Sequence, residues 1–194
     1  MKKNGWIILL AVVIIAAVWC IGAYNSLVSN EESVTKAWAQ VENVYQRRAD
    51  LIPNLVNTVK GYAKHESSTL EAVMEARSKA VATNIDPTKM TAEQLREFQT
   101  NQDALGNAIG RLLMIREAYP DLKANENFSQ LQAQLEGSEN RITEERRKYN
   151  EAAQQYNVSR RKFPKNLIAN MFGFAEKPYF EAKAGSDEVP VVEF

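Results

Sequence analysis

Residues 24–62 read YNSLVSNEESVTKAWAQVENVYQRRADLIPNLVNTVKGY. Apolar side chains recur in this stretch at steps of three and four residues, or of their sum, which places them on one face of an α-helix. The members of this stripe are Leu27, Val34, Trp38, Val41, Tyr45, Ile52, Leu55, Val59 and Tyr62. Only Glu31 and Arg48 interrupt the register, so the pattern predicts a helix buried against partner helices over most of its length.

Two features bear on where this helix ends. Pro53 is expected to kink or restart it, because proline lacks a backbone donor and clashes with the preceding turn. Residues 63–82 also favour helix. One helix could therefore continue to about Ala82, or a turn near residues 65–68 could reverse the chain, with Ser68 and Glu71 as a capping box. We expect continuity, because no proline or glycine pair marks a turn there.

Two more long helices are predicted downstream. Thr91 and Gln94 offer a capping box for a helix that runs to about Tyr119, where Pro120 is a stop signal. After the loop PDLKAN, Asn125 can cap a helix that ends before Pro164. Short loops between long helices make neighbours antiparallel, so the predicted fold is all-α, with an up-and-down bundle of three to four long helices.

A membrane anchor precedes the bundle. Residues 6–23 read WIILLAVVIIAAVWCIGA, 18 residues without a charge, which as a helix would span about 27 Å and suffice to cross a bilayer. Lys2 and Lys3 precede this run, so the positive-inside rule predicts a cytoplasmic N-terminus at residues 1–5. Trp6, Trp19 and Tyr24 stand near its two ends, where amphipathic rings favour the membrane interface.

Two processing alternatives fit the N-terminal run less well. A cleaved signal peptide would have a short apolar core before small residues, whereas this core is long and uninterrupted. Cys20 could be acylated in a lipoprotein, but the residue before such a cysteine should be small, and here it is Trp19. We therefore expect the run to be retained as a single transmembrane helix.

Charge and reactive groups argue against several function classes. Removing Lys2 and Lys3 from the 24 basic residues leaves 22 against 24 acidic ones, so no basic face for nucleic acid is expected. Cys20 is the only cysteine and His65 the only histidine, and Thr69 stands where HExxH needs its second histidine. We expect no cofactor, no metal site, no small-molecule substrate and no catalysis.

One polar feature interrupts the stripe. Arg48, with Asp50 two residues on, forms a candidate ion pair within a motif that is otherwise apolar on this face. Arg48 could set register or bind a partner, or it could pair with a carboxylate from another helix. We favour pairing, because a buried charge is costly without a partner.

Several segments together resemble the LemA family of bacteria: AWAQVENVYQRRADLIPNLVNTVKGYAKHE, EAYPDLKANENFSQLQAQLEGSENRI, RRKYNEAAQQYN and FPKNLIANMFGF. The resemblance covers almost the whole chain and departs visibly only at Tyr45, where the family usually has a more polar or aliphatic residue. It implies a bacterial inner-membrane protein with one span, a cytoplasmic N-terminus and a helical domain outside the cytoplasm. It implies no known reaction and transfers no site residue.

The expected organisation is therefore an N-terminus at 1–5, a span at 6–23, a helical domain at 24–162 and an aromatic-rich tail at 163–194. If the first helix continues to Ala82, the other helices reach only to about Leu55. The candidate self-association face Val34, Trp38, Val41 and Tyr45 would then need cover from the tail or from copies of the chain. We expect a membrane-anchored, homo-oligomeric scaffold or adaptor; the alternative is a regulator or sensor that presents the domain to an envelope protease or signalling protein.

The tail carries a predicted short helix near residues 166–172 and several aromatic residues. These are Phe163, Phe172, Phe174, Tyr179 and Phe180. They could cap the open end of the chain's own bundle or dock onto a neighbouring subunit. Packing on the chain's own core is the commoner use of apolar residues, and we favour it.

Overall fold

The computed structural model describes residues 2–83 and 85–181, with side chains from residue 5 onward, and every regular element in this part of the chain is helical. The elements are α1 (Lys2–Tyr62), α2 (Ser67–Ala82), α3 (Ala92–Met114), the 3-10 helix η1 (Ile115–Ala118), α4 (Pro120–Lys123), α5 (Glu126–Arg161) and α6 (Lys165–Phe172). The prediction of an all-α fold is confirmed.

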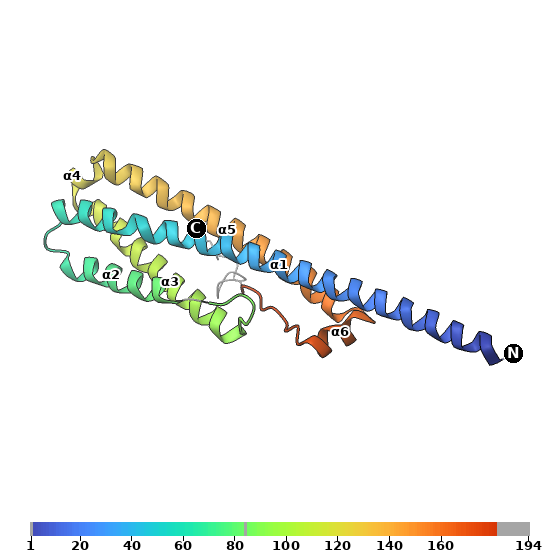
Figure 1. The fold of residues 1–194 in the computed structure, drawn as a ribbon. Helices are drawn as coiled ribbons and strands as arrows, with labels where there is room; N and C mark the ends of the chain where they lie inside the picture. Colours follow the sequence, from blue (N-terminus) through green and yellow to red (C-terminus); the bar gives the residue numbers. More distant parts are fainter. Residues whose placement is uncertain (1, 84, 182–194) are drawn as a thin grey trace, which may run out of the picture.

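Four helices form an elongated bundle in which the chain alternates direction (Figure 1). The distal part of α1 runs outward, α2 returns, α3 runs outward and α5 returns along α1. Helix α6 and the segment after it then lie beside α1 at the end of the bundle that faces the N-terminus. The predicted up-and-down arrangement is therefore observed.

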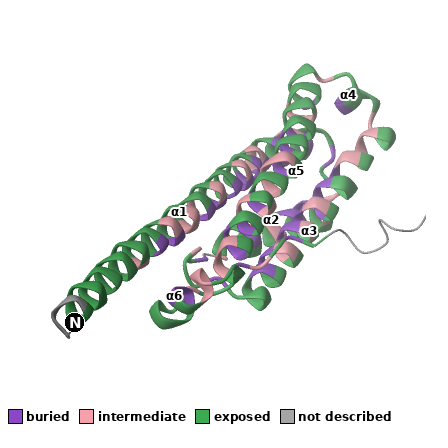
Figure 2. Cartoon of the chain, turned by 90° about the vertical axis from the view of Figure 1, so that its right-hand side faces the viewer, coloured by how far each residue is buried: buried purple, intermediate pink, exposed green. Residues whose placement is uncertain are grey.

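The N-terminal part of α1 projects beyond the bundle. Figure 2 shows this part exposed on all sides, and its large apolar side chains, from Trp6 to Ile21, are 41–75% exposed. Among the described residues, α1 is the one helix that is long and apolar enough to cross a membrane. This apolar segment fits a membrane anchor.

The predicted continuity to Ala82 is wrong, because α1 ends at Tyr62 and the chain reverses over residues 63–66. The turn near residues 65–68, left open as the alternative, is observed, but without its Ser68–Glu71 capping box, since α2 begins at Ser67 with Glu66 at its N-cap and no side-chain cap bond. The turn brings Leu70 and Val73 back against the first helix, where they are buried. A continuous helix would leave these apolar side chains in water, so tertiary burial outweighs the local preference.

Pro53 does not restart α1, which runs through it to Tyr62, and the predicted kink stays a prediction. Proline at this position removes the hydrogen bond that the carbonyl of Ala49 would otherwise accept. The Nε atom of Arg77, on α2, donates to that carbonyl at 2.8 Å. A side chain from a neighbouring helix thus satisfies the acceptor that proline leaves vacant.

The two other predicted helix starts are confirmed. Thr91 accepts from the Gln94 amide at 3.2 Å while the Gln94 side chain accepts from the Thr91 amide at 3.0 Å, which completes the capping box. Asn125 accepts from the Phe128 amide at 2.9 Å. The expected loop PDLKAN is wrong in part, since Pro120 begins the short helix α4, and proline is well suited to a first helical position.

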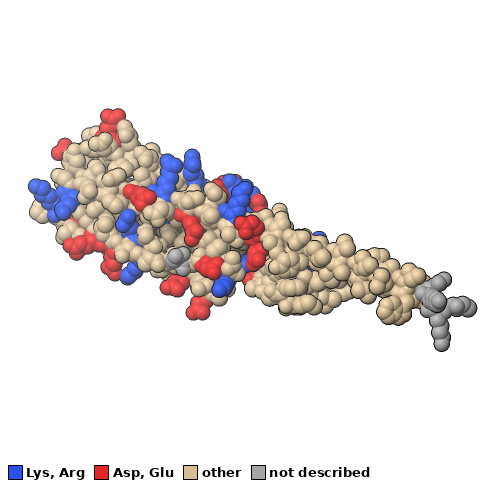
Figure 3. All heavy atoms as spheres, viewed as in Figure 1, with Lys and Arg blue, Asp and Glu red and all other residues tan. Residues whose placement is uncertain are grey.

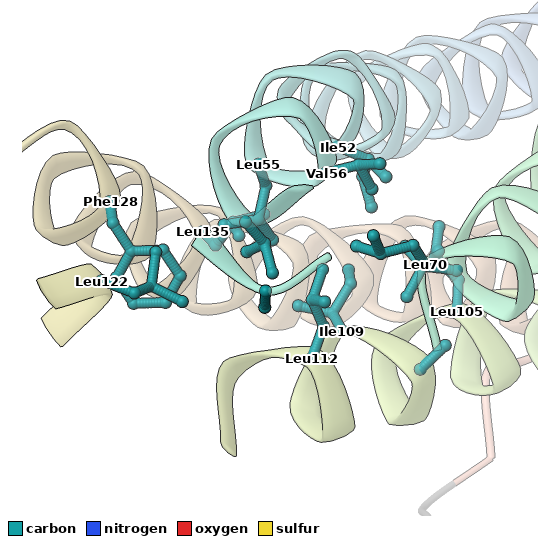
Figure 4. Close-up of a cluster of buried hydrophobic side chains, with 14 of the residues drawn as sticks. Ile52, Leu55, Val56, Leu70, Leu105, Ile109, Leu112, Leu122, Phe128 and Leu135 are labelled. Carbon is teal, nitrogen blue, oxygen red and sulfur yellow. The ribbon is translucent and has the colours of Figure 1, made fainter. Parts of the chain in front are cut away.

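Three apolar clusters follow one another along the molecule. The distal core, shown in Figure 4, joins Ile52, Leu55, Val56, Val59, Ala63, Leu70, Val73, Ala80, Leu105, Ala108, Ile109, Leu112, Leu122, Phe128 and Leu135. The middle core joins Val34, Trp38, Val41, Tyr45, Ile85, Met90, Leu95, Phe98, Ile142, Tyr149, Ala153, Tyr156 and Phe180. The junction cluster joins Ala23, Leu27, Ile168 and Ala169, at the border with the apolar segment.

Candidate functional site

The two charged residues that interrupt the apolar stripe each belong to an ion pair whose cation is buried. Arg48 is 3% exposed, and its Nη1 atom lies 2.6 Å from Oε1 of Glu139 on α5. Its Nη2 atom donates to the side chain of Gln102 at 2.6 Å and to the backbone carbonyl of Gln102 at 3.0 Å. The guanidinium also lies over the Tyr45 ring, 5.1 Å from its centroid. Arg48 thus ties α1 to α3 and α5 between the distal and middle cores.

The partner of Arg48 comes from another helix, as the favoured interpretation predicted, but it is not Asp50. Asp50 is exposed and accepts from the Gln46 side chain at 2.7 Å. Positions two apart on a helix face different directions, so Asp50 points away from the surface that buries Arg48. The candidate pair Arg48–Asp50 is therefore corrected to Arg48–Glu139.

The second interruption, Glu31, pairs with a residue of the tail. Nζ of Lys177 lies 2.7 Å from Oε1 of Glu31, and the Lys177 side chain is 1% exposed. The same ammonium donates to the carbonyls of Pro87 and Thr88 at 3.2 and 2.8 Å. A buried cation with three acceptors is well satisfied, so Lys177 joins the tail, α1 and the loop before α3.

The tail segment 174–181 runs as an extended strap along α5 and is held by two Tyr-Asn pairs. The Tyr156 and Tyr149 hydroxyls donate to the carbonyls of Ala175 and Pro178, at 2.8 and 3.1 Å. Each asparagine side chain binds one strap residue through both its amide donor and its carbonyl acceptor. Asn157 binds the backbone of Lys177 at 2.8 and 3.0 Å, and Asn150 binds that of Phe180 at 3.0 and 2.9 Å.

The spacing of these pairs matches the geometry of an extended strand. Asn150 and Asn157 are seven residues apart, which corresponds to about 10.5 Å along a helix. Lys177 and Phe180 are three residues apart, which corresponds to about 10 Å of extended chain. The repeat on α5 therefore presents equivalent groups to every third residue of the strap. We name the two Tyr-Asn pairs, residues 149–150 and 156–157, the tail clamp.

The clamp tyrosines are desolvated, with consequences for their titration. Burial raises the pKa of Tyr156 to about 12 and also raises the pKa of Tyr149. Both hydroxyls therefore keep the proton that they donate to the strap through the neutral range. The clamp is uncharged, and most of its hydrogen bonds to the strap go to backbone atoms; Asn157 also donates to the Tyr179 hydroxyl at 2.9 Å.

The family model of the LemA family matches residues 37–194. The chain belongs to the LemA family. This match covers the four bundle helices from the middle of α1 onward, the tail clamp and both buried cations. The resemblance drawn from sequence segments is confirmed.

Three curated relatives illustrate the range of similar proteins. Magnetosome protein MamQ 1 of Paramagnetospirillum magneticum is 29% identical over 186 residues, which cover 87% of this chain and 68% of that protein. Magnetosome protein MamQ of Magnetospirillum gryphiswaldense is 28% identical over the same shares. Protein LemA of Metamycoplasma hominis is 25% identical over 162 residues, 84% of this chain and 70% of that protein.

The candidate self-association face of this LemA-family chain is covered within the chain itself. Val34, Trp38, Val41 and Tyr45 are all at most 5% exposed. The Trp38 ring stacks on Phe180 of the strap at 6.0 Å and meets Phe98 of α3 edge-on at 5.2 Å. Of the two covers that the sequence left open, the tail and copies of the chain, the tail covers this face together with α3 and α5, so its assignment as a self-association face is corrected. The strap folds back onto the stripe, and the reversal after α1 brings α3 and α5 close enough to cover it.

The predicted membrane-interface residues lie along the exposed part of α1. The side chains of Lys2 and Lys3 lie outside the described residues. Trp6 is 75% exposed and Trp19 is 41% exposed, so both can meet lipid. The Tyr24 ring instead contacts α6, with its centroid 5.0 Å from that of Phe172. Their roles at a bilayer surface stay predictions.

The clamp was missed at the sequence level, although a signal was present. The dipeptide Tyr-Asn occurs twice in RRKYNEAAQQYN, one heptad apart, and heptad spacing returns both copies to one helix face. Among residues 2–83 and 85–181, no group of three or more His, Cys, Asp or Glu side chains is placed to hold a metal ion. The contacts of the described site join segments of the chain through hydrogen bonds and ion pairs.

Proposed function

We propose that this LemA-family protein is a membrane-anchored scaffold or adaptor of the bacterial cell envelope, which acts through contacts and not through catalysis. Its apolar segment would cross the inner membrane with the N-terminus in the cytoplasm and the bundle outside. One observation carries the proposal: the apolar segment and the first bundle helix are a single uninterrupted helix, Lys2–Tyr62. Such a helix is about 90 Å long and couples the bundle rigidly to its anchor.

The junction cluster supports this coupling. Ala23 and Leu27 of α1 are buried against Ile168 and Ala169 of α6, directly after the uncharged run. This packing of α6 on α1 would restrict bending of α1 between the apolar segment and the bundle. A rigid mount is the property that a scaffold needs in order to hold its partners at a fixed height above a membrane.

Self-association remains part of the proposal, through surfaces other than the buried stripe. The test is the mass of the full-length chain in detergent, by light scattering with the detergent contribution subtracted, beside the chain lacking residues 1–23. A scaffold should form a stable assembly without added ligand. A monomer in both cases would contradict self-assembly. Extraction of the full-length chain from membranes by alkaline carbonate would contradict the anchor.

The alternative is a regulator or sensor that presents the bundle to an envelope protease or signalling protein. The tail clamp supports the regulator or sensor function, because the clamp binds the strap through backbone groups that any extended segment possesses. Co-purification distinguishes the two functions. A regulator should retain a different protein and lose it when the chain is truncated after Phe172, whereas a scaffold should retain copies of itself.

A further inference from the structure

Helix α6 is apolar on two sides, which is unusual for so short a surface helix. Its inner side is covered, because Ile168 and Ala169 are buried against α1. Its outer side carries Leu167 and Met171, which are 56% and 74% exposed. These two positions are one helical turn apart, and Phe163, 81% exposed, lies in the turn just before the helix.

This exposed apolar side borders the part of the molecule that fits a membrane anchor. The residues that α6 contacts on α1 are Ala23, Tyr24 and Leu27, at the end of the uncharged run. Figure 3 shows charged side chains gathered over the bundle, whereas the visible surface toward the N-terminus is nearly free of them. With residues 6–23 as the proposed membrane span, α6 would lie at the boundary between acyl chains and headgroups.

Basic residues flank this apolar side. Arg161 at the end of α5 and Lys162 directly after it are exposed, and Lys165 begins α6. Lys165 donates to the Ser26 hydroxyl of α1 at 2.9 Å, which places its ammonium beside the end of the apolar run. A short helix with exposed apolar residues and adjoining cations is typical of a segment that lies in a membrane interface and meets anionic headgroups.

We propose that α6, with Phe163, is a second membrane contact of this protein. Phe163, Leu167 and Met171 enter the acyl boundary of the leaflet nearest the bundle, while Arg161 and Lys162 face lipid phosphates. The partner is the lipid surface itself. The contact would fix the tilt and rotation of the bundle, which a single span alone leaves free. This inference rests on the proposed anchor and adds a surface that the anchor does not include.

The test measures the surroundings of single sites in the full-length chain, reconstituted into vesicles of phosphatidylcholine and phosphatidylglycerol. In a Cys20→Ser background, Met171→Cys and Phe163→Cys each carry a nitroxide spin label. Met114→Cys is the matched control, because Met114 is 66% exposed at the distal end of α3. Ile14→Cys, in the middle of the apolar run, is the lipid reference. Accessibility is measured to oxygen, which concentrates in lipid, and to a neutral nickel chelate, which stays in water.

The labels at 171 and 163 should be several-fold more accessible to oxygen, and several-fold less accessible to the chelate, than the label at 114. Accessibility equal to that at 114 would overturn the proposal. Low accessibility to both reagents would show that protein covers the helix, which also overturns it in favour of a second copy. A label at 14 that is accessible to the chelate would instead refute the anchor, so the two failures are distinguishable.

Discussion

The guanidinium Nε of Arg77 donates a 2.8 Å hydrogen bond to the backbone carbonyl of Ala49. That carbonyl lies four residues before Pro53 and receives no hydrogen bond from it. The contact explains how α1 stays continuous through proline, and it ties the second half of α2 to α1. A sequence feature that looks like a helix break is thus a docking point for another helix.

Replacing Arg77 should therefore cost stability only while Pro53 is present. We expect Arg77→Met to lower the free energy of unfolding by about 1 to 2 kcal/mol, because it leaves a partly buried carbonyl without a donor. In a Pro53→Ala background the restored amide can bond to Ala49, and the cost should fall below about 0.5 kcal/mol. Urea unfolding of the four variants in detergent measures this coupling. Equal costs in both backgrounds would contradict it.

The Arg48–Glu139 pair should contribute more to stability than the surface ion pairs. Arg48→Ala removes a buried side chain that bridges three helices and leaves Gln102 without its donor, so we expect a loss of about 3 kcal/mol in the free energy of unfolding. Arg147→Ala is the matched control, because Arg147 is exposed and pairs with Glu144 on its own helix, and it should cost under about 1 kcal/mol. Similar losses for the two variants would refute the bridging role.

The tail clamp predicts which asparagines hold the strap. Asn157→Ala removes both hydrogen bonds to Lys177 and leaves buried backbone groups unpaired, at a cost of about 2 to 3 kcal/mol. Release of the strap should also speed proteolytic cleavage near Lys177. Asn140→Ala, at an exposed position of the same helix, is the control and should change neither quantity. Cleavage at the wild-type rate in Asn157→Ala would mean that the strap does not depend on the clamp.

Alkaline pH should loosen the fold through the clamp tyrosines. Burial raises the pKa of Tyr156 to about 12, against about 10 for an unfolded tyrosine. The raised pKa means that the unfolded chain loses this proton first. The stabilisation is therefore complete below about pH 10 and is lost as the pH rises toward about 12. Tyr156→Phe should lower stability at neutral pH and make this decline shallower, as measured by urea unfolding across the range. An unchanged slope would contradict the assignment.

Two glycines should respond to alanine with opposite signs. Gly173 ends α6 with φ at 74°, a conformation that costs other residues about 1 to 2 kcal/mol, so Gly173→Ala should destabilise the chain. Gly137 lies exposed within α5 with open space around it, and Gly137→Ala should stabilise it by about 0.5 to 1 kcal/mol. Thermal unfolding of both variants is the measurement, and the same sign for both would contradict these backbone assignments.

The sequence by itself determined the helical class, the apolar anchor-like segment, the stripe on α1 and the caps at Thr91 and Asn125. These features follow from composition, from periodicity or from residues three positions apart, and such local relations can be read without knowing what meets in space. The same periodicity identified the two charged positions that interrupt the apolar stripe. Each of them, Glu31 and Arg48, proved to be one member of an ion pair.

Only the tertiary structure decided where the first helix reverses, what covers the stripe and which residues pair. The turn over residues 63–66 lacks a strong local signal and is fixed by burial of Leu70 and Val73 in the distal core. Glu139 meets Arg48 across 91 residues of sequence, and the strap reaches Trp38 because the tail clamp holds it. These contacts depend on the free energy gained when several helices together bury apolar surface and pair their polar groups. That free energy cannot be read from any single stretch of the chain.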